Sequence, residues 1–119
     1  MTIEIFREVC KSKIRSSTQW LESFAGKLAK DPALFLLKNT LLREEYYAAL
    51  SKKTYETCLG YIDEGNSLDE VYSLLNERLI FLVRLEAYDN EYERQELKTV
   101  VEAIDEIARI TLSLEEPEE

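Results

Sequence analysis

The chain contains no histidine and has little glycine, proline or cysteine: three, two and two residues respectively among 119. Without histidine, Ser-His-Asp and Cys-His nucleophile systems, His-ligated zinc and haem sites and the commonest general base are excluded. Cys10 and Cys58 have neither CxxC spacing nor the density of a disulfide scaffold. We therefore expect both thiols to be reduced and packed in the core.

Long apolar runs are also missing. The longest apolar block, residues 79–83, is far shorter than the ~20 residues that span a bilayer. Charged residues interrupt the first eight positions, where a secretory signal would need an apolar core. The three glycines are too scattered for a phosphate-binding loop. The sequence thus predicts a cytoplasmic protein that does not enter membranes and carries no cofactor and no metal.

Charge is abundant but unevenly distributed, and the net charge of the whole chain is −9. Residues 1–60 hold ten basic and seven acidic side chains, whereas residues 61–119 hold five basic and seventeen acidic ones. The second half therefore carries a net charge of −12 and repels a phosphate backbone. This asymmetry argues against direct nucleic-acid binding and favours a partner with a basic surface.

The abundant residues are helix formers, and their periodicity is helical. We expect a single all-α domain over residues 1–114, a compact antiparallel bundle of four to six helices, followed by an acidic disordered tail over residues 115–119. The first apolar stripe fits either one helix over residues 2–30 or two helices that break at residues 16–18. Asp31 and Pro32 predict an N-cap and first turn for the next helix.

The middle of the chain carries clear boundary signals. Residues 51–54 interrupt an apolar stripe as a kink, a short break or an exposed helical turn. Gly65 has the place of a left-handed residue that ends a helix, and Ser67 with Glu70 forms a capping-box pattern. A link this short predicts a hairpin of antiparallel helices.

The next helical segment, residues 68–88, is apolar on nearly every side in its second half, so it belongs at the centre of a bundle or is half covered by a second subunit. A β-strand is the competing interpretation of its short apolar run. Asp89 and Asn90 can end this helix and cap the last one. The last helix has a clear apolar face, made of Leu97, Val100, Val101, Ile104, Ile107 and Ala108.

Carboxylate pairs are the remaining candidates for metal chemistry. Glu93 with Glu96, and Glu102 with Asp105, each have the spacing that places two side chains on one helical face. The order of the pairs resembles the ExxE and ExxD motifs of all-α nucleotide pyrophosphatases. In that family the two pairs stand on different helices, whereas here both fall in one predicted helix. A solvated acidic face is the simpler interpretation, so catalysis is not expected.

Seven tyrosines are the more suggestive signal, because tyrosine is enriched at protein interfaces. Tyr46 and Tyr47 are adjacent, and two neighbours on a helix cannot both point inward. Tyrosines and acidic side chains of the second half together form the predicted partner-binding set: Tyr61, Asp63, Glu64, Asp69, Glu70, Tyr72, Tyr88, Glu91, Tyr92 and Glu93.

These features predict a non-enzymatic, acidic, helical protein-binding module, an inhibitor or adaptor that masks a basic surface of its partner. Toxin-immunity proteins and phage-encoded antagonists of host enzymes share this physical design. Two alternatives stay open. The chain is a structural subunit of a homo-oligomer, such as a homodimer, or of a ribonucleoprotein, or it is a magnesium-dependent nucleotide hydrolase.

Overall fold

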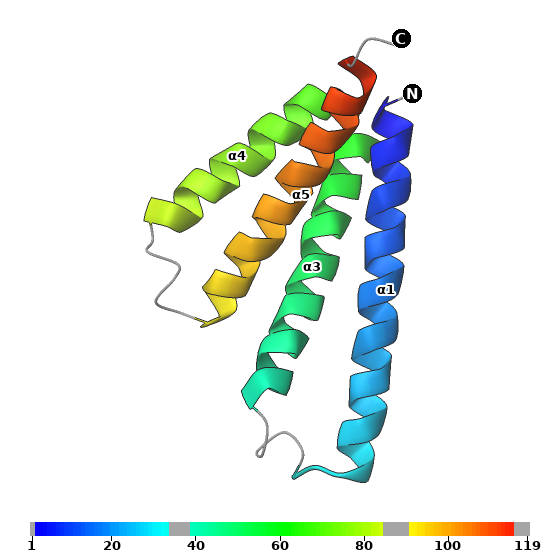
Figure 1. Cartoon of the computed structure of the whole chain (residues 1–119), viewed down its shortest axis with the longest axis vertical. Helices are drawn as coiled ribbons and strands as arrows, with labels where there is room; N and C mark the ends of the chain where they lie inside the picture. The colour runs from blue at the N-terminus through cyan, green and yellow to red at the C-terminus, as the bar shows by residue number, and fades with distance from the viewer. Residues whose placement is uncertain (1, 34–38, 85–90, 116–119) are drawn as a thin grey trace.

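The part of the chain that the structure describes is almost entirely helical. The computed structural model describes residues 2–33, 39–84 and 91–115, which form four helices and no strand: α1 (Thr2–Lys30), α3 (Asn39–Asp63), α4 (Leu68–Arg84) and α5 (Glu91–Glu115). Successive helices run in opposite directions along the long axis (Figure 1). The all-α prediction is confirmed. None of the described helices is long and apolar enough to cross a membrane.

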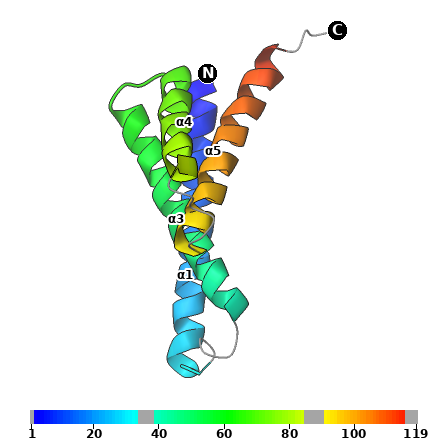
Figure 2. The same ribbon diagram turned by 90° about the vertical axis from the view of Figure 1, so that its left-hand side faces the viewer.

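The molecule is elongated, with principal extents of 54 × 32 × 31 Å. Its radius of gyration is 16.3 Å, against about 13–14 Å expected for a compact domain of this length. Both views show why: α1 and α3 extend beyond α4 and α5 at one end (Figures 1 and 2). We call this extension, formed by the second half of α1 and the first half of α3, the two-helix arm. The expectation of a compact bundle is therefore too simple.

The apolar core lies where all four helices meet. α1 and α3 contribute aromatic, thiol and aliphatic side chains, and α4 and α5 contribute mainly aliphatic ones. The buried members are Phe6, Cys10, Tyr55, Cys58, Ile62, Leu68, Val71, Leu75, Leu82, Val100, Ala103, Ile107 and Ile110. Both cysteines are fully buried and free, as expected.

α1 is one continuous helix, which settles the choice between one helix and two. Ser17 is buried rather than an exposed cap, and it lines a shallow groove with Trp20 of α1 and with Ala48 and Ser51 of α3. Small side chains at these positions let the two helices approach closely. α1 ends at Lys30, and the boundary at Asp31 is confirmed. Pro32 lies in a turn, and the predicted first turn of the next helix falls on residues 34–38, which lie outside the described part.

α3 passes through residues 51–54 without a break. The exposed-turn alternative is wrong for two of these residues, because Ser51 and Thr54 are buried. Thr54 Oγ1 is 2.9 Å from Thr99 Oγ1 of α5, so the two buried hydroxyls form a hydrogen bond. Without this bond, burying the Thr54 hydroxyl would destabilise the fold.

The link between α3 and α4 has the predicted stereochemistry. Gly65 has a φ of 93°, the left-handed conformation that glycine adopts without a Cβ penalty. The amide of Gly65 donates to the carbonyl of Ile62, and the amide of Asn66 donates to that of Tyr61, which makes a Schellman motif. The Ser67 hydroxyl accepts from the Glu70 amide at 3.2 Å, and the Glu70 carboxylate accepts from the Ser67 amide at 3.0 Å. The capping box is confirmed.

α4 lies at the edge of the bundle, not at its centre (Figure 1). It packs mainly against α5 through one face, which carries Leu68, Val71, Leu75 and Leu82. Residues 79–84 are helical, so the strand alternative is wrong for them. Leu85 and the predicted cap at Asp89 and Asn90 lie outside the described residues. α5 includes Glu115, and residues 116–119 of the predicted tail are likewise outside the described part.

Candidate functional site

Acidic residues from the predicted set gather where α3 turns into α4. We call Asp63, Glu64, Asp69 and Glu70 the acidic turn; all four are exposed. Asp63 Oδ1 accepts from Arg7 Nη1 of α1 at 3.0 Å. Hydrogen bonds from Ser67 hold the pKa of the Glu70 carboxyl below its ordinary value. Two of the four carboxylates therefore have protein partners, and Glu64 and Asp69 extend the negative surface beside them.

The tyrosines of the predicted set are placed differently from one another. Tyr72 is exposed by 39 % on α4, whereas Tyr61 is half-buried on α3. Of the adjacent pair, Tyr47 lies against α5: its hydroxyl donates to Glu102 Oε2 at 2.5 Å, and Lys98 Nζ lies 4.7 Å from its ring centroid. Among the described tyrosines of the set, Tyr72 is thus the exposed candidate for a contact.

The remaining predicted residues do not join the acidic turn. Glu93 is half-buried at the beginning of α5, at the other end of α4 from the acidic turn (Figure 1). The 17 residues of α4 span about 25 Å at 1.5 Å per residue. Tyr88 lies outside the described residues, as do the side chains of Glu91 and Tyr92. The predicted set is therefore divided between two ends of the α4–α5 pair.

Aliphatic and aromatic side chains on α4, absent from the predicted set, form an exposed surface. We call Ile80, Phe81 and Val83 the outer α4 surface; they are exposed by 51, 48 and 54 %. Arg78 lies over the Phe81 ring, 5.0 Å from its centroid. The sequence of residues 79–85 could have predicted this surface, because it is apolar on nearly every side of the helix. A helix of that composition at the edge of a bundle must leave apolar side chains exposed.

A second apolar feature lies between α4 and α5, nearer the beginning of α4. The α4–α5 groove has a volume of about 320 Å³ and is lined by Asp69 and Tyr72 of α4 and by Ile107, Ala108, Thr111 and Leu112 of α5. Leu112 is exposed by 60 % and Val101, further along α5, by 39 %. The expectation that Val101 lies on the buried face is therefore wrong: the apolar face of α5 is wider than its contact with the bundle.

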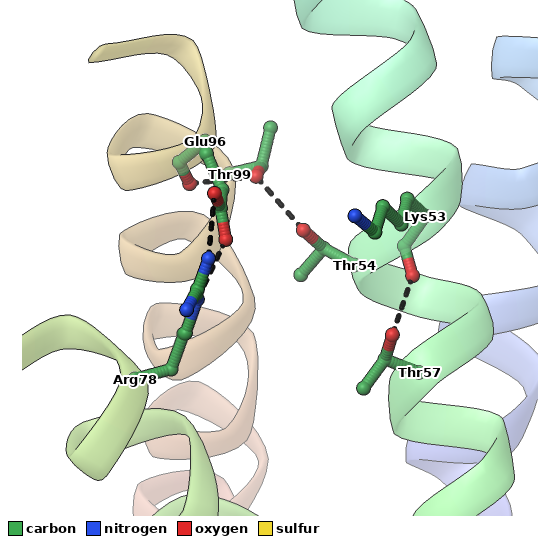
Figure 3. A network of polar contacts seen from close by, with 6 residues as sticks. All are labelled: Lys53, Thr54, Thr57, Arg78, Glu96 and Thr99. Atoms are coloured by element: carbon green, nitrogen blue, oxygen red, sulfur yellow. Dashed lines mark hydrogen bonds and ion pairs between the residues drawn. The ribbon is translucent and has the colours of Figure 1, made fainter. Parts of the chain in front are cut away.

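A polar network links α3, α4 and α5 (Figure 3). Arg78 donates through Nε and Nη2 to both carboxylate oxygens of Glu96, at 2.7 and 2.9 Å. Hydrogen bonding to Glu96 raises the pKa of Arg78. Thr99 Oγ1 donates to the Glu96 carbonyl at 2.8 Å, so the hydrogen between the two threonine hydroxyls comes from Thr54.

This network lines a hollow of about 350 Å³ that has an apolar floor of Leu50, Leu75 and Val100. Figure 3 shows the Thr57 hydroxyl turned back to the carbonyl of Lys53, at 2.9 Å. The polar groups are thus directed mainly at each other. We assign the network to the positioning of α4 against α5, which fixes the two apolar surfaces described above.

The carboxylate pairs do not converge. All four residues lie on α5, and two of them are bound by other helices: Glu96 by Arg78 and Glu102 by Tyr47. Across the described ranges, no group of three or more His, Cys, Asp or Glu side chains is arranged to hold a metal ion. The pairs therefore face different neighbours instead of one shared centre.

Comparison with known proteins gives no relative: no protein-family model, no curated protein and no solved structure matches the chain.

Proposed function

We propose that the chain is an acidic protein-binding module of the inhibitor or adaptor kind, which covers a basic surface of a protein partner. The observation that supports this proposal best is the outer α4 surface, where three large apolar side chains on one edge helix are about half exposed. Apolar side chains grouped in this way mark interaction sites more often than side chains scattered singly.

The magnitude of the proposed contact follows from the exposure. Burying a whole Ile, Phe or Val side chain contributes about 1.5–3 kcal/mol. Because about half of each side chain of the outer α4 surface is already buried, completing the burial contributes about 1 kcal/mol per residue. The three together contribute about 3 kcal/mol, which corresponds to roughly a hundredfold in Kd.

Charge supplies the second part of the proposal. The acidic turn lies at the beginning of the same helix, and residues 61–119 carry a net charge of −12. A field of one sign accelerates encounter with a partner of the opposite sign, and this acceleration decreases as salt is added. Affinity would therefore come mainly from the apolar contact, and association rate and selectivity from the acidic turn.

The test is affinity capture from the native host with the full chain as bait, followed by binding measurements on the protein captured. Ile80→Asp with Val83→Asp removes two of the three contacts, about 2 kcal/mol, and is expected to weaken binding by roughly thirtyfold or more. Ile5→Asp is the matched control, because Ile5 is exposed by 46 % on α1. Glu64→Gln with Asp69→Asn is expected to slow association and reduce its dependence on salt. Equal loss of binding in the α4 variant and the Ile5 control would contradict the proposal.

Self-association is the second candidate, because a second copy could also cover the outer α4 surface. Sedimentation velocity at low and high salt distinguishes the two. A dimer that Ile80→Asp with Val83→Asp converts to a monomer supports a homo-oligomeric subunit. A monomer at every salt concentration contradicts self-association and favours the protein-binding module.

A further inference from the structure

Apolar side chains form one stripe on α4 and another on α5. On α4, Tyr72, Leu79 and Val83 recur at spacings of seven and four residues, so they lie along one side of the helix. On α5, Val101, Ala108 and Leu112 recur at the same spacings in the same way. The two stripes meet in the α4–α5 groove, where Tyr72 lies next to Ala108 and Leu112, and we call the line between the stripes the seam.

Apolar side chains of the described parts of α4 and α5 stay exposed along the seam. The opposite side of α5 is occupied by α3, as the contacts of Thr99 with Thr54 and of Glu102 with Tyr47 show. On the seam, by contrast, Leu112 and Val83 keep more than half of their side chains exposed. An apolar channel that remains between two packed helices matches the shape of a third helix laid along it.

One exposed acidic side chain on each helix lies near its stripe. Asp69 lines the groove three residues before Tyr72, and Asp105 is exposed four residues after Val101. The nearest basic side chain on α5 is Arg109, whose Nη1 lies 3.7 Å from Glu106 Oε1. An occupant would therefore need aliphatic side chains in the centre and positive charges along its sides.

We propose that the α4–α5 groove binds one amphipathic helix of a protein partner, with aliphatic side chains against Tyr72, Ala108 and Leu112 and with Lys or Arg beside Asp69 and Asp105. This inference rests on the proposed function and specifies the partner's binding element. Eleven residues separate Tyr72 from Val83, a rise of about 16 Å or three helical turns. The partner helix is thus about three to four turns long.

The probe is a synthetic amphipathic helix of about 14 residues that has leucines on one face and lysines and arginines beside them. Two further peptides serve as controls: one with glutamates in place of the basic residues, and one scrambled with the same composition. Fluorescence anisotropy with the full chain is expected to show binding of the basic helix, weaker binding of the scrambled peptide and none of the acidic one.

Variants then locate the site. Leu112→Asp is expected to weaken binding of the basic helix by roughly tenfold or more, and Ile5→Asp is expected to leave it unchanged. Asp69→Asn with Asp105→Asn is expected to flatten the dependence of Kd on salt. Circular dichroism of Leu112→Asp checks that the variant is folded, which is expected because that side chain is mostly exposed.

Equal binding of the basic and scrambled peptides, or unchanged affinity in Leu112→Asp, overturns the groove as a helix site. That outcome is distinguishable from failure of the proposed function. If capture of a partner is weakened by Ile80→Asp alone, which lies outside both stripes, while Leu112→Asp has no effect on it, the module stands and the groove does not. If neither surface affects capture, both proposals are wrong.

Discussion

Tyr55 is a core residue at which a substitution is expected to stabilise the fold, whereas most substitutions in a core destabilise it. The side chain is fully buried, and its hydroxyl has no hydrogen-bond partner among the described residues. Burial raises the pKa of this phenol, since the neighbourhood disfavours the charged form. A buried hydroxyl without a partner costs about 1–3 kcal/mol relative to its hydrated state. Removing it should therefore stabilise the fold.

Tyr55→Phe is expected to raise the free energy of unfolding by about 1 kcal/mol, and the melting temperature by about 4 °C. Only the oxygen is removed, so the ring keeps its packing against the core. Equilibrium urea denaturation followed by circular dichroism measures the change, with the slope against urea checked for constancy.

The matched control is Tyr47→Phe, the same substitution at a tyrosine whose hydroxyl donates to Glu102. Since a hydrogen bond is lost there and an acceptor is left behind, this variant should lose about 1 kcal/mol. A loss of similar size at both positions would refute the reasoning, because it would show that the Tyr55 hydroxyl is satisfied in the folded protein.

Three further predictions concern the α3–α4 link and Tyr47. Gly65→Ala should lose about 1–2 kcal/mol in urea denaturation, because the φ of 93° penalises a Cβ although no atom lies within 4 Å of it. Ser67→Ala should lose about 1 kcal/mol at neutral and at acid pH, because the bond that it removes joins the Ser67 hydroxyl to the Glu70 amide, which does not titrate. The Ser67 amide stays in the variant and lowers the Glu70 pKa, so the stabilisation from that bond is present above pH 4.5 and is lost as pH falls through the lower folded value in both proteins; parallel acid titrations are therefore expected. Burial and the hydrogen bond to Glu102 raise the pKa of Tyr47 to about 12, so its contribution is complete below pH 10 and is lost as pH rises towards 12. Absorbance at alkaline pH should show that Tyr47 and the buried Tyr55 ionise late, and Tyr47→Phe should remove the earlier of these two late transitions.

The parts of the fold that the sequence predicted well are those decided by local chemistry. Gly65 and the Ser67–Glu70 pair depend on a few adjacent residues, so their turn and cap could be recognised without knowing what surrounds them. The period of the apolar residues likewise placed Cys10 and Cys58 inside. In these cases the residue type and the spacing carry nearly all of the information.

The parts that the sequence did not predict depend on partners far away in the chain. Ser51 and Thr54 look polar and exposed until the hydroxyl of Thr99 is placed opposite Thr54. Val101 belongs to the apolar period of α5, but the bundle is too narrow on that side to cover it. The predicted site was divided for the same reason. Asp69 and Glu93 are both acidic, but the residues around each of them do not show that the two lie at opposite ends of α4.

The contact between Cys10 and Cys58 gives the molecule an internal probe of its own motion. Each thiol belongs to a different helix, and a hydrogen bond with Cys58 together with burial raises the pKa of Cys10. A buried, protonated thiol does not react with alkylating reagents, so reaction requires α1 to separate from α3. The rate of thiol modification therefore reports how often the helix pair opens, and a partner that clamps the bundle would slow that rate without touching either sulfur.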